Sequence, residues 1–144
     1  MIFLPENQYQ ALRQWVVEKA PADLPELEAR TTTFAEFRMY DQKDRCQFLD
    51  GRNHCRLHAE GVKPDECFWW PFHVFSAADG GLEIRMSTTC CDGFRYYTPG
   101  LPFLDQIESQ AKRIGYARLR AFRGVFPGSD QLKVIKKLAG SKEA

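Results

Sequence analysis

All five cysteines of this 144-residue chain lie between positions 46 and 91, and none occurs before or after that segment. They stand at four places along it, namely Cys46, Cys55, Cys67 and the pair Cys90–Cys91. Thiolates are the strongest soft-metal ligands among the side chains, so a fold that brings these places together would create a metal centre. The sequence therefore points to a metal-binding module, and it does not state the purpose of that module.

Size and composition predict one domain that spans residues 1–144, since 44% hydrophobic and 13% aromatic residues suffice for a core without crosslinks. No apolar run approaches the roughly 18 residues that a membrane span needs, and the first residues lack the pattern of a secretory signal. We therefore expect a soluble, cytoplasmic protein. In that reducing compartment an odd number of cysteines favours free or metal-bound thiols. In a periplasmic protein, two disulfides and one thiol would be favoured instead.

Positive charge is concentrated at the C-terminal end. Residues 111–144 carry nine Lys/Arg against two Asp/Glu, a net +7, whereas residues 1–110 carry eleven against seventeen, a net −6. Such a segment can bind an acidic protein or, as a weaker alternative, nucleic acid, because both reward clustered positive charge. The other interpretation is a solvated surface that complements the acidic part of the same molecule.

Hydrophobic periodicity and turn residues predict several elements. Pro5 precedes a helix over 6–19, whose apolar residues recur at helical spacing. The stretch 24–40 fits either a short helix and a strand or two short helices. A β-hairpin is predicted from an aromatic strand over 68–75 and an alternating strand over 82–87, which would bring Cys67 and Cys90 to one end of the ladder.

Two further helices are predicted in the basic region 103–139. The first runs over 103–122, with apolar side chains on one face and basic side chains, namely Lys112, Arg113, Arg120 and Arg123, on another. The second begins after Ser129, a suitable N-cap, and runs to residue 138. Together the patterns predict an α+β protein with a single domain, in which helices flank a small antiparallel hairpin sheet that bears the cysteines.

The cysteine spacing is C-x8-C-x11-C-x22-C-C, and none of these intervals is the short C-x2–4-C knuckle of common zinc sites. The alternative is that the cysteines are small buried apolar residues. Against it, the hairpin gives a reason for Cys67 and Cys90–Cys91 to meet, and turns over 50–54 and 61–66 can return the other two cysteines. Four thiolates suffice for a tetrahedral zinc ion or for a four-iron cluster.

Residues 46–93 resemble the YkgJ-type family of zinc- or iron-chelating domains. The matching pieces occur in the family's order and are Cys46-Gln47-Phe48-Leu49, Cys55-Arg56-Leu57-His58, Lys63-Pro64 with Cys67, Pro71-Phe72, and Cys91-Asp92-Gly93. The resemblance implies a cysteine-cluster core over 46–93 that holds an iron–sulfur cluster or zinc. The family's upstream block with a cysteine doublet has no counterpart here, since no cysteine precedes Cys46.

We expect one metal centre on Cys46, Cys55, Cys67 and either Cys90 or Cys91, serving redox chemistry, metal handling or a partner enzyme. Aromatic neighbours of the cysteines could provide a dry shell, which favours an iron–sulfur cluster over zinc. The alternative is a protein- or nucleic-acid-interaction module with a structural zinc and a basic docking surface. A thiol enzyme is the third class, and no residue is singled out as catalytic.

The three histidines are the remaining candidate ligands. His54, His58 and His73 could each replace one thiolate, and His58 is the first choice among them. We expect surface or core roles for all three, because four or five thiolates already fill a coordination sphere.

Overall fold

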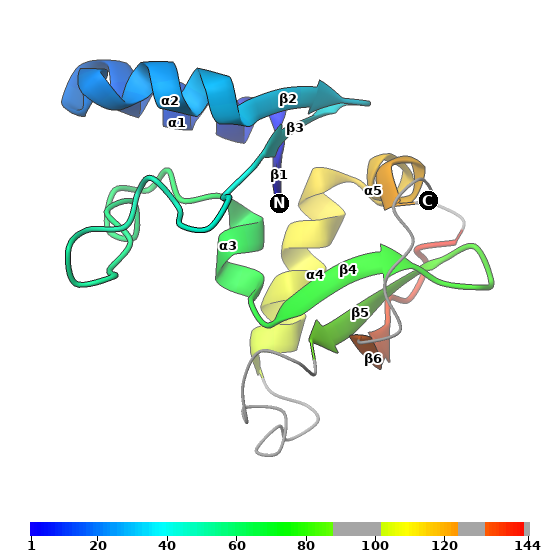
Figure 1. Ribbon diagram of the computed structural model, residues 1–144. Coiled ribbons are helices and arrows are strands. Elements are labelled where there is room, and N and C mark those ends of the chain that lie inside the picture. Colours follow the sequence, from blue (N-terminus) through cyan, green and yellow to red (C-terminus); the bar gives the residue numbers. More distant parts are fainter. Residues whose placement is uncertain (88–101, 124–131, 143–144) are drawn as a thin grey trace. The chain divides into compact units, whose positions relative to one another are not determined.

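The computed structural model describes residues 1–87, 102–123 and 132–142. The chain divides into two compact units, 1–68 and 69–144, and the division falls within one short helix. Helices and antiparallel sheets occur together, so the α+β class is confirmed (Figure 1). Whether the two units make up a single domain stays a prediction. None of the described helices combines the length and apolar character that crossing a bilayer requires.

The first unit is built from a helical pair and a small sheet. Its elements are β1 (Ile2–Pro5), α1 (Glu6–Lys19), the 3-10 helix η1 (Pro21–Asp23), α2 (Leu24–Arg30), β2 (Thr31–Phe34), β3 (Phe37–Tyr40) and the start of α3 (Asp65–Trp69). The strands are antiparallel in the order β1-β3-β2. The stretch 24–40, for which the sequence left two possibilities, is thus a helix followed by a hairpin.

Apolar side chains explain how these elements meet. The helix predicted over 6–19 is confirmed as α1, and it buries Tyr9, Leu12 and Val16 on one face. They form one core with residues of β1, α2, β3 and the following loops, namely Leu4, Leu27, Tyr40, Phe48 and Leu57. Burial of such side chains contributes roughly 1.5–3 kcal/mol each, which anchors the otherwise irregular segment 41–64 to the helices.

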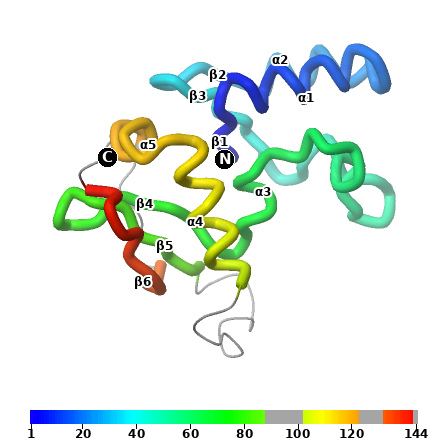
Figure 2. The backbone as a smooth tube through the Cα atoms, turned by 180° about the vertical axis from the view of Figure 1, so that it is seen from behind, coloured from blue at the N-terminus to red at the C-terminus, as the bar shows by residue number. Residues whose placement is uncertain are grey.

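The second unit is a three-stranded sheet with two helices. Its elements are β4 (Phe72–Ser76), β5 (Leu82–Ser87), α4 (Pro102–Ile114), α5 (Tyr116–Arg123) and β6 (Leu132–Lys137). The strands are antiparallel in the order β4-β5-β6, and α4 and α5 lie against one face of this sheet (Figure 2). The buried side chains of that face include Val74, Ile84 and Met86.

The predicted hairpin is confirmed, but its first arm is shorter than expected. β4 pairs with β5 from Phe72 opposite Met86 to Ser76 opposite Leu82, and Gly80 takes a positive φ of 86° in the turn. The residues before Phe72 belong to α3 and to the turn after it, because Asp65 and Glu66 provide a helix start. Cys67 therefore lies in a helix, and the prediction of a strand over 68–71 is wrong.

Two predictions for the C-terminal region are also wrong. The single helix over 103–122 is divided into α4 and α5, because Gly115 adopts a φ of 109° between them. The last predicted helix is replaced by β6, whose β-branched Val134 and Ile135 suit a strand that pairs with β5. The basic region 103–139 therefore contains helices and a strand. Ser129, the predicted N-cap, lies outside the described residues.

Candidate metal centre

The candidate site lies within the first unit, at a cavity of about 30 Å³. All three cysteines that the structure describes, Cys46, Cys55 and Cys67, line this cavity, and all three are free thiols. The other lining residues are Ile2, Leu4, Leu12, Tyr40, Gln42, Phe48, Leu57, Lys63 and Pro64. Three thiols that are separated by 8 and 11 intervening residues in the sequence thus reach one apolar space. Cys90 and Cys91 lie outside the described residues.

Turns in the segment 41–64 bring Cys46 and Cys55 together. The chain reverses between Leu49 and Cys55, which form an isolated antiparallel bridge, and Arg56 N–H donates to the Phe48 carbonyl at 2.8 Å. Asp50 stabilises this reversal, because its carboxylate accepts the backbone N–H groups of Arg52 and His54 at 2.8 and 3.0 Å. These two N–H bonds lower the pKa of Asp50.

Cys67 reaches the cavity from α3, which is tied to the N-terminal residues. The Glu66 carboxylate is buried and accepts the Phe3 N–H at 2.6 Å. Gln8 and Asp65 bond to each other twice, since the Gln8 amide donates to the Asp65 carboxylate at 2.9 Å and accepts the Asp65 N–H at 3.0 Å. α3 is therefore held against β1 and α1, and its thiol keeps a defined position.

The electrostatic environment keeps Cys67 protonated in the metal-free protein. The pKa of its thiol is raised to about 12, mainly by burial and then by the nearby Glu66, Cys46 and Cys55, whereas Lys63 acts in the opposite direction. The Glu66 carboxylate disfavours a thiolate here, and so would thiolates at Cys46 and Cys55. A bound cation would reverse this balance, because it stabilises the thiolates that the apolar walls disfavour.

Tyr40, at the end of β3, contacts Cys46 directly. Its hydroxyl lies 3.7 Å from the Cys46 sulfur, 3.2 Å from the Gln47 backbone nitrogen and 3.3 Å from the Gln47 side-chain oxygen. Burial raises the pKa of Tyr40, so the hydroxyl keeps its proton. Tyr40 could not be assigned to the site from the sequence, because it lies in the stretch 24–40, for which no single structure was predicted.

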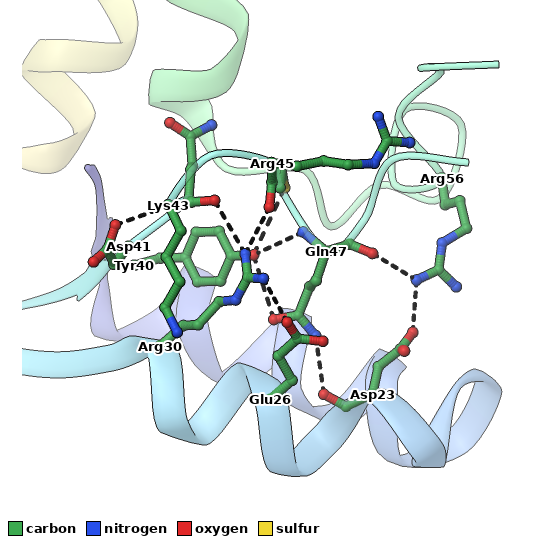
Figure 3. Close-up of polar contacts among 11 residues, drawn as sticks. Asp23, Glu26, Arg30, Tyr40, Asp41, Lys43, Arg45, Gln47 and Arg56 are labelled. Atoms are coloured by element: carbon green, nitrogen blue, oxygen red, sulfur yellow. Dashed lines mark hydrogen bonds and ion pairs between the residues drawn. The ribbon is translucent and has the colours of Figure 1, made fainter. Parts of the chain in front are cut away.

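Arg30, the last residue of α2, holds the chain that leads to Cys46. Its guanidinium donates to the carbonyls of Gln42 and Arg45 at 3.1 and 2.8 Å and to the Glu26 carboxylate at 2.5 Å (Figure 3). Burial lowers the pKa of Arg30, but Tyr40 and Glu26 more than offset this effect, so the pKa is raised overall. Arg30 therefore remains charged beside Tyr40 and the loop.

The histidines do not line the cavity. The His58 ring lies 5.8 Å from the Phe68 ring, and its Nδ1 lies 3.2 Å from the Lys63 ammonium nitrogen. The exposed His54 donates its backbone N–H to Asp50, and His73 is on β4 in the other unit. Among the described residues, the cysteines are therefore the usual metal ligands that line the cavity.

The three sulfur atoms are not arranged as the ligands of one metal ion. Among the residues that the structure describes, no group of three His, Cys, Asp or Glu side chains could hold a metal ion as it stands. Cysteine has three staggered χ1 positions, so rotation about one bond moves each sulfur without moving the backbone. The cavity between them provides space for that movement.

No family model, no curated protein and no solved structure matches this chain.

Proposed function

We propose that the first unit binds a metal centre through Cys46, Cys55 and Cys67, with Cys90 or Cys91 as the fourth ligand. The observation that carries this proposal is the shared cavity: each described cysteine lines the same small space. If the cysteines served merely as small apolar residues, nothing would require all three to face one cavity. We also propose that the chain is related to the YkgJ-type chelating domains that residues 46–93 resemble.

The chemistry of the cavity favours a soft or borderline ion. Its lining residues are the three cysteines, mostly apolar side chains and Tyr40, Gln42 and Lys63, with no carboxylate or imidazole among them. Thiolates select zinc, copper(I) and iron–sulfur clusters over calcium or magnesium. Lys63 contributes a positive charge at the wall, which would offset part of the negative charge of a tetrathiolate site.

The two candidate centres differ in what they require besides the cysteines. Zinc needs four ligands at about 2.3 Å and no inserted sulfide, whereas a four-iron cluster adds four iron and four sulfide ions to the same four cysteines. Zinc is therefore the first candidate and an iron–sulfur cluster the second. Either centre could serve redox chemistry, metal handling or a partner enzyme.

A basic docking surface is a weaker candidate function. Several of the basic side chains in the second unit bind acidic side chains of that same unit. Lys136 lies 2.7 Å from Glu108 and 3.4 Å from Asp105, and Lys137 lies 3.4 Å from Asp79. These pairs support the interpretation that the basic residues complement the molecule's own acidic groups.

The test is metal and sulfide analysis of the full chain purified without oxygen. We expect about one equivalent of zinc and no acid-labile sulfide, whereas iron with an equal amount of sulfide would identify a cluster. Serine in place of Cys46, Cys55 or Cys67 should remove the metal. Serine at Cys90 and at Cys91, one at a time, identifies the fourth ligand.

His58→Gln is the matched control, because His58 is beside the site without lining it. This variant should keep the metal content of the unaltered protein. A protein that contains no metal and takes up neither zinc nor iron with sulfide would refute the proposal. So would retention of metal by all three serine variants.

A further inference from the structure

The hydroxyl of Tyr40 is the polar group that contacts the Cys46 sulfur, at 3.7 Å. This oxygen already accepts the backbone N–H of Gln47 at 3.2 Å, so its position is fixed from one side. Its single proton can go to the Gln47 side-chain oxygen at 3.3 Å or to the sulfur. The choice between these acceptors depends on the state of the sulfur.

A thiol and a thiolate make different demands on that proton. A neutral thiol is a weak acceptor and can itself donate, whereas a thiolate has no proton and carries a negative charge. Hydrogen bonds to charged acceptors are roughly twice as strong as those between neutral groups. The Tyr40 proton therefore turns toward Cys46 when this sulfur loses its own proton, and the Gln47 amide oxygen is left as the weaker acceptor.

Hydrogen bonds to neighbouring residues keep the Tyr40 hydroxyl close to the Cys46 sulfur. Arg30 fixes the carbonyls of Gln42 and Arg45, directly before Cys46, and its charge lies beside the Tyr40 hydroxyl. The Gln47 side chain donates to the Asp23 carbonyl at 3.0 Å, which anchors the residue after Cys46 (Figure 3). Both flanks of the cysteine are thus tied to α2 and η1, so the distance to Tyr40 is maintained by several contacts.

We propose that Tyr40 is a positioning residue of the metal centre, whose hydroxyl donates a hydrogen bond to the Cys46 thiolate and thereby sets its orientation and its donor strength toward the metal. This inference rests on the proposed function. Groups that orient a ligand from behind typically change metal affinity by about 10- to 100-fold when they are removed. A hydrogen bond to sulfur also withdraws electron density from the metal–sulfur bond, which affects the electronic spectrum as well as the affinity.

Cobalt(II) is a suitable probe, because it replaces zinc in thiolate sites and its thiolate charge-transfer band reports on the sulfur ligands. The full chain, freed of metal, is titrated with Co²⁺ alone. In Tyr40→Phe we expect this band to move to lower energy and the Co²⁺ affinity to fall by about 10-fold. Loss of packing alone would weaken binding without a systematic movement of the band.

Tyr9→Phe is the matched control. Tyr9 is equally buried in the same core, and its ring faces Arg38 at 4.8 Å instead of a cysteine. The control should keep the band energy and the affinity of the unaltered protein. If Tyr40→Phe behaves as Tyr9→Phe does, the inference is wrong while the metal site stands. If the unaltered protein shows no cobalt–thiolate band, both the site and the inference are wrong.

A second variant covers the case in which Tyr40→Phe does not fold. In Tyr40→3-fluorotyrosine the ring and the hydroxyl remain, and fluorine makes the hydroxyl a stronger donor. The band should then move to higher energy than in the unaltered protein, opposite to the change in Tyr40→Phe. An unchanged band in this variant would overturn the inference even if the phenylalanine variant could not be studied.

Discussion

The two units of this molecule are stabilised in different ways. In the second unit, three strands pair in a regular ladder, and buried apolar side chains of β5 such as Ile84 and Met86 lie on one face. In the first unit, the segment 41–64 that carries two of the cysteines has almost no ladder. Besides the buried Phe48 and Leu57, it is held by individual polar side chains, chiefly Arg30 and Asp50, that bond to its backbone.

This difference indicates which substitutions should destabilise each unit most. A sheet distributes its stability over many similar contacts, and removal of a central apolar side chain leaves a cavity. An irregular segment depends on a few side chains that satisfy its backbone groups, and a buried carbonyl without a donor costs about 1–3 kcal/mol. The irregular segment is also free to place ligands at positions that a regular strand would not allow.

The largest effect should come from truncation in the second unit. Ile84 is completely buried in the central strand β5, so Ile84→Ala should lower the free energy of unfolding by about 3 kcal/mol. Val134→Ala on the neighbouring strand β6 is the control, because Val134 is 47% exposed and its loss should cost less than about 0.5 kcal/mol. Urea unfolding measures both, and equal costs would contradict the assignment of Ile84 to the core.

A polar substitution in the first unit should have the next largest effect. Arg30→Gln removes the donors to the Gln42 and Arg45 carbonyls, which are only partly buried or exposed, so at about 1 kcal/mol for each bond we expect a loss of about 2 kcal/mol and weaker metal binding. The control is Arg13→Gln, since Arg13 also pairs with a glutamate of α2, at 2.9 Å, but on the exposed surface. Its cost should stay below about 1 kcal/mol.

The same comparison separates stability from binding. If the loop is held as described, Arg30→Gln should change both the urea midpoint and the Co²⁺ affinity, whereas Arg13→Gln should change neither by much. A variant at Arg30 that binds metal as well as the unaltered protein does would show that Arg30 has no part in placing Cys46.

Elements with strong periodicity could be predicted from the sequence. The helix over 6–19 and the hairpin turn near Gly80 follow from spacing and turn residues, and the structure confirms both. For two of the wrongly predicted elements, the sequence did contain a local signal for the observed structure, but other residues favoured a different one. Asp65 and Glu66 after a proline mark a helix start, but the aromatic residues that follow them resembled a strand. Gly115 interrupts an otherwise helical pattern, and its positive φ ends α4.

Other features depend on contacts that a single sequence does not reveal. The segment over 132–137 has basic residues at helical spacing, yet pairing with β5 makes it a strand, which is an override of local preference by tertiary structure. The turns that return Cys46 and Cys55 were expected from their turn formers. Tyr40 and Arg30 were not expected, because the hydroxyl beside the Cys46 thiol and the guanidinium on the carbonyls before it arise from packing between residues that are apart in the sequence.

The smallest effect, and the finest test of the comparison, is the acid dependence of the segment 41–64. The backbone N–H bonds from His54 and Arg52 lower the pKa of Asp50 in the folded state. The folded state therefore binds fewer protons than the unfolded state in acid, so the stabilisation by Asp50 is present above the unfolded pKa near 3.9 and is lost as the pH falls through the folded value.

Asp50→Ala should lower the urea midpoint at pH 7, and the difference from the unaltered protein should shrink as the pH approaches 3. Asp50→Asn keeps an oxygen acceptor without the titration, so it should retain part of the stability with a flatter acid dependence. An acid dependence identical in all three proteins would mean that the Asp50 turn does not stabilise the loop between Cys46 and Cys55.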